Sequence, residues 1–128
     1  MKILVVDDCY SLQALMEDIL TFLHYEDIHF ADNAQEALEK IPVLSPDCIL
    51  LDWHMPDMNG LELLQHLKCD MHTRDIPVIM LTAESKLDNV KKAIECGAEG
   101  YILKPINEEL LRIRLMDVER EHFLGLKK

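Results

Sequence analysis

The chain contains short, continuously apolar runs that alternate with segments of helical periodicity. Four such runs occupy residues 3–6, 48–51, 78–81 and 101–103. Continuous apolar runs of this length predict strands of a parallel sheet, because helices cover both faces of such a sheet. A fifth segment, residues 26–30, alternates polar and apolar residues, which predicts a half-exposed strand at the sheet edge.

Between the predicted strands, apolar residues recur every three or four positions, as they do in amphipathic helices. The segment 11–23 shows this spacing most regularly and predicts a helix packed on the sheet. A second helix is predicted to begin at Asn33, whose side chain can cap it together with Glu36. We expect that helix to end at a loop bracketed by Pro42 and Pro46.

Three more helices are predicted after the third, fourth and fifth strands. The first of them follows the turn-forming pair Asn59-Gly60, and Ser85 and Asn107 can cap the other two. The pattern is therefore a β-strand followed by a helix, repeated five times. Because crossover connections between parallel strands are almost always right-handed, it predicts a doubly wound α/β sandwich.

Composition narrows the classes of function. A length of 128 residues suits one domain, and the formal net charge of −11, without a Lys/Arg cluster, argues against direct nucleic-acid binding. The sequence contains neither a signal-peptide pattern nor an apolar stretch that could span a bilayer, so we expect a soluble, cytoplasmic protein with no membrane partner. The four cysteines form no C-x-x-C pair, which favours reduced thiols over disulfides or zinc.

Polar residues of a particular kind follow four of the predicted strands. Asp7-Asp8 follows the first, Asp52 the third, Thr82 the fourth and Lys104 the fifth. Ligands of open parallel sheets bind beyond the carboxyl ends of the strands. We therefore expect three carboxylates, a hydroxyl and an ammonium group to converge on one pocket.

Three carboxylates in one crevice repel one another unless a cation compensates or a proton is shared. Mg²⁺ prefers oxygen ligands and is often held by one or two carboxylates together with phosphate oxygens, so it would also recruit a phosphoryl group. A carboxylate can itself attack phosphorus and form an aspartyl phosphate. Lys104 would then offset charge on the phosphoryl oxygens, and the Thr82 hydroxyl would donate a hydrogen bond to them.

With these motifs in this order, the chain resembles a response regulator receiver domain of two-component signalling, of the single-domain chemotaxis type. The resemblance covers roughly residues 2–120 and rests on Asp7-Asp8, Asp52-Trp53-His54-Met55-Pro56, Thr82-Ala83-Glu84 and Lys104-Pro105. It implies a flavodoxin-like (βα)5 sandwich with a parallel five-stranded sheet in the order 2-1-3-4-5. We assign residues 1–121 to the receiver domain and residues 122–128 to a C-terminal tail.

The resemblance implies a role for each residue of the pocket. Asp52 would be the phosphoacceptor, which takes a phosphoryl group from a phosphohistidine of a partner kinase or from a small phosphodonor. Mg²⁺ would be held by Asp7, Asp8, the Asp52 carboxylate and the backbone carbonyl of His54. Lys104 would pair with the phosphoryl group. The chain would promote only its own phosphorylation and dephosphorylation, so it would not be an enzyme in the usual sense.

The resemblance also implies a switch. Thr82 would move toward the phosphoryl group, and Tyr101 stands at the position of an aromatic side chain that turns inward as the hydroxyl residue shifts. His54 and Glu84 occupy positions that tune the lifetime of the phosphorylated state. The peptide bond before Pro105 is cis in the family.

The expected partners are a sensor histidine kinase or phosphotransfer protein and a downstream protein target. We expect the output contact on the surface of the fourth helix, fifth strand and fifth helix, formed with another protein or with a second copy as a homodimer. The reason is that apolar residues spread around most of the fifth helix: Leu110, Leu111, Ile113, Leu115, Met116 and Val118. Alternatively, residues 119–128 cover that helix.

Other interpretations remain open at this point. Asp7 and Asp8 can simply cap a helix, Tyr101 can be an ordinary half-buried aromatic residue, and the pocket can belong to a scaffold that is never phosphorylated. A haloacid-dehalogenase-like phosphatase also uses an aspartate and Mg²⁺, but its second aspartate would stand where His54 does. A flavin mononucleotide carrier would need a hydroxyl- and Gly-rich phosphate loop after the first strand, where the acidic pair stands instead.

Overall fold

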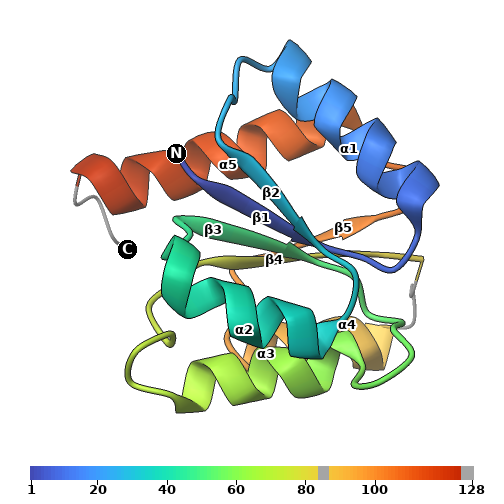
Figure 1. Ribbon diagram of the computed structural model, residues 1–128, viewed down its shortest axis with the longest axis vertical. Helices are drawn as coiled ribbons and strands as arrows, with labels where there is room; N and C mark the ends of the chain where they lie inside the picture. The colour runs from blue at the N-terminus through green and yellow to red at the C-terminus, as the bar shows by residue number, and fades with distance from the viewer. Residues whose placement is uncertain (84–86, 125–128) are drawn as a thin grey trace.

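The computed structural model describes residues 1–83 and 87–124 and contains one sheet between two layers of helices (Figure 1). The elements follow one another in the predicted alternation. In chain order they are β1 (Ile3–Val6), α1 (Tyr10–Phe22), β2 (Ile28–Ala31), α2 (Ala34–Leu44), β3 (Cys48–Leu51), α3 (Gly60–Cys69), β4 (Val78–Thr82), α4 (Leu87–Glu95), β5 (Gly100–Leu103) and α5 (Glu108–Leu124).

The five strands are parallel and lie in the order β2-β1-β3-β4-β5, which confirms the doubly wound fold and the strand order that the resemblance implies. β2 is an edge strand, and three of its four residues are only partly buried, as the alternating pattern of residues 26–30 predicts. β1, β3 and β4 are buried along their whole length. The carboxyl ends of all five strands meet at one edge of the sheet.

Helices cover both faces of the sheet (Figure 1): α1 and α5 lie on one face, and α2, α3 and α4 on the other. Alternate side chains of each strand enter the two cores. In β1, Leu4 and Val6 contribute to the core beneath α2 and α3, whereas Ile3 and Val5 pack with α1 and α5. This coverage on both sides explains why the strands are continuously apolar in sequence.

Side-chain caps fix where several helices begin. Asn33 caps α2, because its side chain accepts a hydrogen bond from the Glu36 amide at 2.8 Å, as predicted. Asn107 accepts from an amide in the first turn of α5 at 3.0 Å. Asn59 forms a capping box with Glu62 at the start of α3, so it starts a helix rather than a turn. The predicted cap Ser85 lies outside the described residues.

Pro42 does not end α2, contrary to the sequence prediction. The helix continues to Leu44 and ends at Ser45, which adopts a left-handed conformation with φ of 49° and donates its amide to the Ile41 carbonyl at 2.8 Å. Pro42 lies in the last turn, where its missing N–H removes one hydrogen bond near the helix end. The buried stripe that includes Ala37 and Ile41 holds the helix on the sheet despite this loss.

The apolar residues of α5 divide between two environments. Leu111, Leu115 and Val118 are buried against the sheet, whereas Ile113 and Met116 remain 39% and 46% exposed. α5 continues through residue 124, past residue 121, where the sequence places the end of the receiver domain. Within the described parts of the chain, every helix is too short or too polar to cross a membrane.

Candidate acidic site at the carboxyl edge of the sheet

The sheet register places two carboxylates side by side. Val6 at the end of β1 pairs with Leu51 at the end of β3, so Asp7 and Asp52 are the first residues beyond two neighbouring strands. The ladder continues one residue further, because the Asp52 amide donates to the Val6 carbonyl at 3.0 Å. The main chain therefore fixes both residues where their strands end.

Three carboxylates meet at this edge. Asp7, Asp8 and Asp52 each offer an oxygen atom, and these three atoms lie within 4.8 Å of one another. Asp7 and Asp52 are only 2% and 6% exposed, whereas Asp8 is exposed to solvent. The predicted convergence of carboxylates is therefore present, with two of the three charges shielded from water.

Lys104 extends into the same cluster from the end of β5. Its Nζ lies 3.1 Å from Asp7 Oδ2 and 3.4 Å from Asp52 Oδ1. The Lys104 amide donates to the Thr82 carbonyl at 2.9 Å, which continues the β4–β5 ladder by one residue. Lys104 thus contacts two of the three clustered carboxylates, and among the described residues the cluster keeps an excess of negative charge.

This imbalance shifts the ionisation of the buried groups. Burial raises the pKa of the Asp52 carboxyl, and the negative charge of Asp7 raises it further, so that Lys104 offsets only part of the effect. Partial burial by itself lowers the pKa of Lys104, but the charges of Asp52 and Asp7 outweigh it and the pKa rises. Lys104 therefore remains an ammonium group, while the ionised Asp52 carboxylate is destabilised until another cation approaches.

Hydrogen bonds hold Asp7 in place on every side. Its Oδ1 accepts from the Cys9 amide at 2.8 Å, and its Oδ2 faces Lys104. Its backbone carbonyl accepts from Gln13 Nε2 at 2.7 Å, and the same amide group donates to the Asp32 carboxylate at 2.8 Å. The cap residue of α1 is Cys9, so Asp7 contributes to the pocket rather than standing at the cap position itself.

Thr82 and Tyr101 face the same side of the sheet from neighbouring strands. Tyr101 pairs with Met80, two residues before Thr82, and side chains two residues apart in a strand point to the same face. Met80 and Tyr101 both pack in the core beneath α2, α3 and α4. Thr82 is fully buried and Tyr101 is partly buried. The hydroxyl residue at the pocket and the tyrosine therefore share one layer of the protein.

The loop from β3 to α3 folds back on the strand that carries Asp52. The Gly60 amide donates to the Trp53 carbonyl at 2.6 Å. A Cβ atom at Gly60 would lie 2.1 Å from the Asp52 carbonyl oxygen, so only glycine fits there. Within the loop, Trp53 is buried and His54, two residues after Asp52, is exposed.

Two further predictions concern Pro105, which follows Lys104, and Glu84, which follows Thr82 by two residues. The peptide bond between Lys104 and Pro105 is cis, which is the isomer that the resemblance implies. Glu84, the second residue expected to tune the phosphorylated state, lies outside the described residues. The carboxylates and Lys104 thus gather at one edge of the sheet, where β4 ends at Thr82 and His54 follows Asp52 by two residues.

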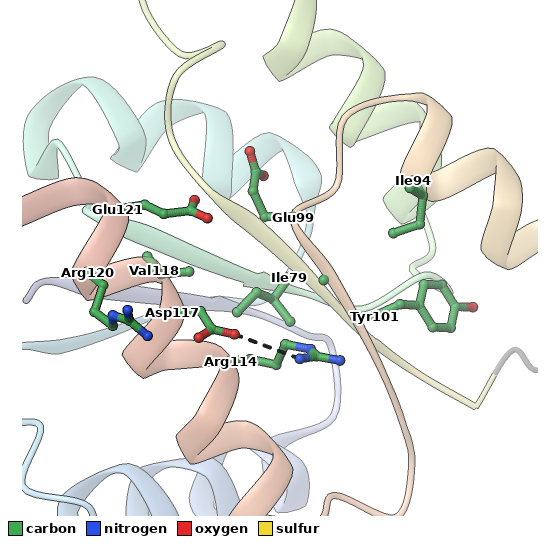
Figure 2. Close-up of a pocket in the computed structure, with 10 residues that line it drawn as sticks. Ile79, Ile94, Glu99, Tyr101, Arg114, Asp117, Val118, Arg120 and Glu121 are labelled. Atoms are coloured by element: carbon green, nitrogen blue, oxygen red, sulfur yellow. Dashed lines mark ion pairs between the residues drawn. The ribbon is translucent and has the colours of Figure 1, made fainter. Parts of the chain in front are cut away.

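A cavity of about 460 Å³ lies apart from the acidic site, beside β5 (Figure 2). Ile94 of α4, Tyr101 of β5 and several charged residues of α5 line it. Figure 2 shows the Tyr101 ring directed away from the α5 side chains, among which Arg114 and Asp117 form an ion pair at 3.9 Å. The cavity belongs to the surface that sequence analysis assigns to output contacts.

Two polar residues near the site could not be found from the sequence pattern. Gln13 faces the acidic edge because it lies in the first turn of α1, directly above the Asp7 carbonyl. Asp57 accepts hydrogen bonds from amides of α2, more than twenty residues earlier in the chain. Asp7 lies before the helix, so helical periodicity does not pair it with Gln13, and nothing in the sequence indicates the partners of Asp57.

Comparisons with known proteins agree with this geometry. The family model described as "Response regulator receiver domain" matches residues 3–116. Chemotaxis protein CheY1 of Helicobacter pylori is 37% identical over 116 residues, which is 90% of this chain and 94% of the relative. Chemotaxis protein CheY-3 of Vibrio cholerae is 34% identical over 90% of this chain and 88% of that protein.

Solved structures give the same result. The crystal structure of Vibrio cholerae chemotaxis protein CheY4 superposes with a TM-score of 0.83 at 32% identity, covering 91% of this chain and 97% of the other. The signal receiver domain of a DNA-binding response regulator from Colwellia psychrerythraea superposes with a TM-score of 0.87 at 28% identity, over 92% and 97% of the two chains. The fold is therefore shared along almost the whole length of the solved chains.

Proposed function

Because the chain belongs to the response regulator receiver domain family, we propose that Asp52 is the phosphoacceptor of a two-component signalling switch. Members of this family are phosphorylation-dependent signalling proteins. One observation carries the assignment to Asp52: its carboxylate is buried beside Lys104 and two further carboxylates, at the carboxyl edge of the sheet. Asp8 is exposed, whereas Asp52 follows β3, the central strand of the sheet, which supports Asp52 as the reacting group.

The donor atoms of the site suit Mg²⁺. Asp7, Asp8 and Asp52 provide carboxylate oxygens, which this hard cation prefers. By resemblance to the family, the backbone carbonyl of His54 would be a further oxygen ligand. The excess negative charge of the cluster supports the same choice. When bound, Mg²⁺ supplies positive charge next to the phosphoryl oxygens.

The residues of the chain then perform the transfer. A carboxylate oxygen of Asp52 attacks the phosphorus atom, and the bond from phosphorus to the histidine nitrogen or acyl oxygen of the donor breaks, leaving the electron pair on the donor. Lys104 stays protonated and pairs with the phosphoryl oxygens. The Thr82 hydroxyl donates a hydrogen bond to one of them.

Thr82 and Tyr101 form the switch. When Thr82 moves toward the phosphoryl group, space opens in the layer that both side chains share, and the Tyr101 ring turns into it. The common face of the two residues and the partial burial of Tyr101 support this coupling. The new charge at Asp52 thus changes the surface around β5.

His54, and Glu84 two residues after Thr82 in the sequence, set the lifetime of the aspartyl phosphate. His54 stands two residues after Asp52 at the rim, where its ring can order or hinder the attacking water. Glu84 has the corresponding place after Thr82. Substitution of His54 by alanine is expected to change the dephosphorylation rate, measured after removal of the phosphodonor, and an unchanged rate would exclude this role.

The partners are a sensor histidine kinase or phosphotransfer protein and a downstream protein that contacts α4, β5 and α5. Several apolar side chains on this surface are exposed, among them Leu87 at 66%, Ile94 at 49% and Leu103 at 46%. The cavity between Ile94 and α5 adds a hollow to the same surface (Figure 2). A second copy of the chain, as a homodimer, is the competing occupant of this surface.

Intact mass spectrometry tests the proposed function directly. After incubation with acetyl phosphate and Mg²⁺, the protein is expected to gain one phosphoryl group, about 80 Da. The gain should require Mg²⁺, disappear in Asp52→Asn and persist in Asp75→Asn, which removes an exposed carboxylate away from the site. No gain would favour the scaffold that is never phosphorylated, and steady release of phosphate from a phosphomonoester would favour the phosphatase.

A further inference from the structure

The loop between β3 and α3 is tied to the start of α2 through the side chain of Asp57. Its Oδ1 accepts from the Ala34 amide at 3.3 Å, and its Oδ2 accepts from the Gln35 amide at 3.1 Å. Oδ1 also accepts from the Met58 amide within the loop, at 2.8 Å. One carboxylate therefore joins two segments that lie more than twenty residues apart in the chain.

α2 does not depend on Asp57 alone for its cap. Asn33 stands at the cap position, and its side chain accepts from the Glu36 amide at 2.8 Å. Asp57 takes the amides of the two preceding residues in the same first turn. The Glu36 amide thus donates to Asn33 at the start of the same helix, whereas the Ala34 and Gln35 amides donate to Asp57 in another loop.

The hydrogen bonds of Asp57 hold a loop, residues 53–60, that is also closed at its two ends. The Gly60 amide donates to the Trp53 carbonyl, which closes residues 53–60 into a compact loop. Asp57 joins the middle of this loop to α2, three residues after His54. Between these two attachments, the main chain around His54 has little freedom to rotate.

We propose that Asp57 is a positioning residue for the metal site, which holds the loop against α2 and thereby directs the His54 carbonyl toward the acidic cluster. This inference rests on the proposed Mg²⁺ site. Residues that orient metal ligands commonly matter for affinity almost as much as the ligands. Desolvation by burial raises the pKa of Asp57, but the backbone amides of Gln35, Met58 and Ala34 together outweigh it and hold the pKa below its ordinary value, so the tie persists in mildly acidic buffer.

A matched pair of variants separates positioning from helix capping. Asp57→Ala and Asn33→Ala each remove an acceptor from the first turn of α2, but only Asp57→Ala releases the loop. Trp53 is the only tryptophan and lies next to Asp52, so its fluorescence reports Mg²⁺ binding. We expect Asp57→Ala to raise the Mg²⁺ Kd about tenfold and Asn33→Ala to leave it nearly unchanged.

Hydrogen exchange of the metal-free protein provides the second readout. Amides of residues 53–59 should exchange faster in Asp57→Ala than in the wild type, whereas Asn33→Ala should affect amides of α2 alone. Equal changes of the Mg²⁺ Kd in the two variants, or no change in either, would contradict the positioning role and leave Asp57 as a helix cap only. If Asp57→Ala does not fold, Asp57→Asn serves instead, since it keeps one acceptor oxygen and should give a smaller shift of the same kind.

The two readouts also separate this inference from the proposed function. A wild-type protein that binds no Mg²⁺ would contradict the proposed metal site, while faster exchange in Asp57→Ala would still show that the loop is tethered. Conversely, normal Mg²⁺ binding with unchanged exchange and Kd in Asp57→Ala would overturn the inference and leave the proposed function standing.

Discussion

The two ends of the sheet both use a lysine, but they balance its charge differently. At the amino ends of β4 and β5, the Lys68 ammonium group donates to the carbonyls of Arg74 and Ile76 and lies 3.3 Å from Glu99. Glu99 in turn accepts from the Val78 amide at 2.8 Å. At the carboxyl ends, Lys104 faces Asp7 and Asp52, with Asp8 close to both.

The difference lies in the count of charges. One cation meets one anion at the amino end, and neutral backbone groups complete the network. At the carboxyl end, within residues 1–83 and 87–124, the cluster holds one cation and three anions, two of them buried. A balanced network of this kind serves stability, whereas an unbalanced one costs stability until a ligand supplies the missing charge. Substitutions at the two ends should therefore separate folding from binding.

The largest loss of stability is expected from a steric change at the carboxyl end. Gly60→Ala places a Cβ atom against the Asp52 carbonyl, where the backbone cannot easily yield. We expect a loss of about 3 kcal/mol in the free energy of unfolding, measured by urea denaturation. Gly97→Ala is not a suitable control, because that glycine has a positive φ of its own. A stability unchanged in Gly60→Ala would mean that the loop after β3 packs differently.

Removal of Lys104 tests the charge imbalance at the carboxyl ends of the strands. Lys104→Met leaves Asp7 and Asp52 without their cation, and we expect a loss of about 2 kcal/mol at neutral pH. Because the carboxylates remain, Mg²⁺ should restore part of this stability by binding the folded state. Urea denaturation with and without Mg²⁺ measures both effects. A variant as stable as the wild type in metal-free buffer would contradict the account of the charge imbalance.

The matching substitution at the amino end should affect stability alone. Lys68→Met removes the partner of Glu99 and of two carbonyls, and we expect a loss of about 1.5 kcal/mol. The Mg²⁺ Kd, followed by Trp53 fluorescence, should stay unchanged because the ion pair lies at the opposite end of the strands. Mg²⁺ should not rescue this variant beyond the stabilisation it gives the wild type. A changed Kd would remove the distinction between the two ends.

Neutralising Asp52 should have the smallest effect, and in the opposite direction. Its pKa in the folded protein is raised above the ordinary 3.8 by burial and by Asp7. The folded state therefore binds more protons than the unfolded chain as pH rises from about 4, and stability falls over that window. The asparagine of Asp52→Asn does not ionise, so its stability should not fall over this pH window. We expect its free energy of unfolding to exceed that of the wild type by about 1 kcal/mol at pH 7 in metal-free buffer.

Thermal unfolding from pH 4 to pH 7 checks this prediction. The gain in Tm of Asp52→Asn over the wild type should grow as pH increases. The gain should shrink when Mg²⁺ is added to both proteins, because Mg²⁺ stabilises the ionised Asp52 carboxylate, which only the wild type has. Asp75→Asn is the matched control and should show no such trend. A variant less stable than the wild type at neutral pH would contradict the cost assigned to the buried carboxylate.

Much of the fold follows from local patterns. The central strands are continuously apolar because both faces are covered, and β2 alternates because it lies at the edge. The caps at Asn33 and Asn107 need only contacts within three residues, which is why the sequence predicts them correctly. Pro42 illustrates the limit of such patterns, because the packing of α2 on the sheet outweighs the local cost of a proline in its last turn.

The candidate site is predictable for a related reason. Asp7, Asp52 and Lys104 are the first residues beyond β1, β3 and β5, so their meeting at one edge follows from parallel topology. Contacts made by loops do not follow from topology. The ties from Gln13 to Asp7 and from Asp57 to α2 depend on the paths of particular loops and on side-chain rotamers, which only the structure provides.

The most direct test of the central claim is to locate the phosphoryl group on the chain. An acyl phosphate of aspartate is reduced by borohydride to homoserine, and peptide mass spectrometry then identifies the residue that carried it. After phosphorylation with acetyl phosphate and Mg²⁺, we expect homoserine at position 52 and unaltered Asp7 and Asp8. Homoserine at position 7 or 8, or a phosphoryl group that resists reduction on His54, would contradict the assignment of Asp52 as phosphoacceptor.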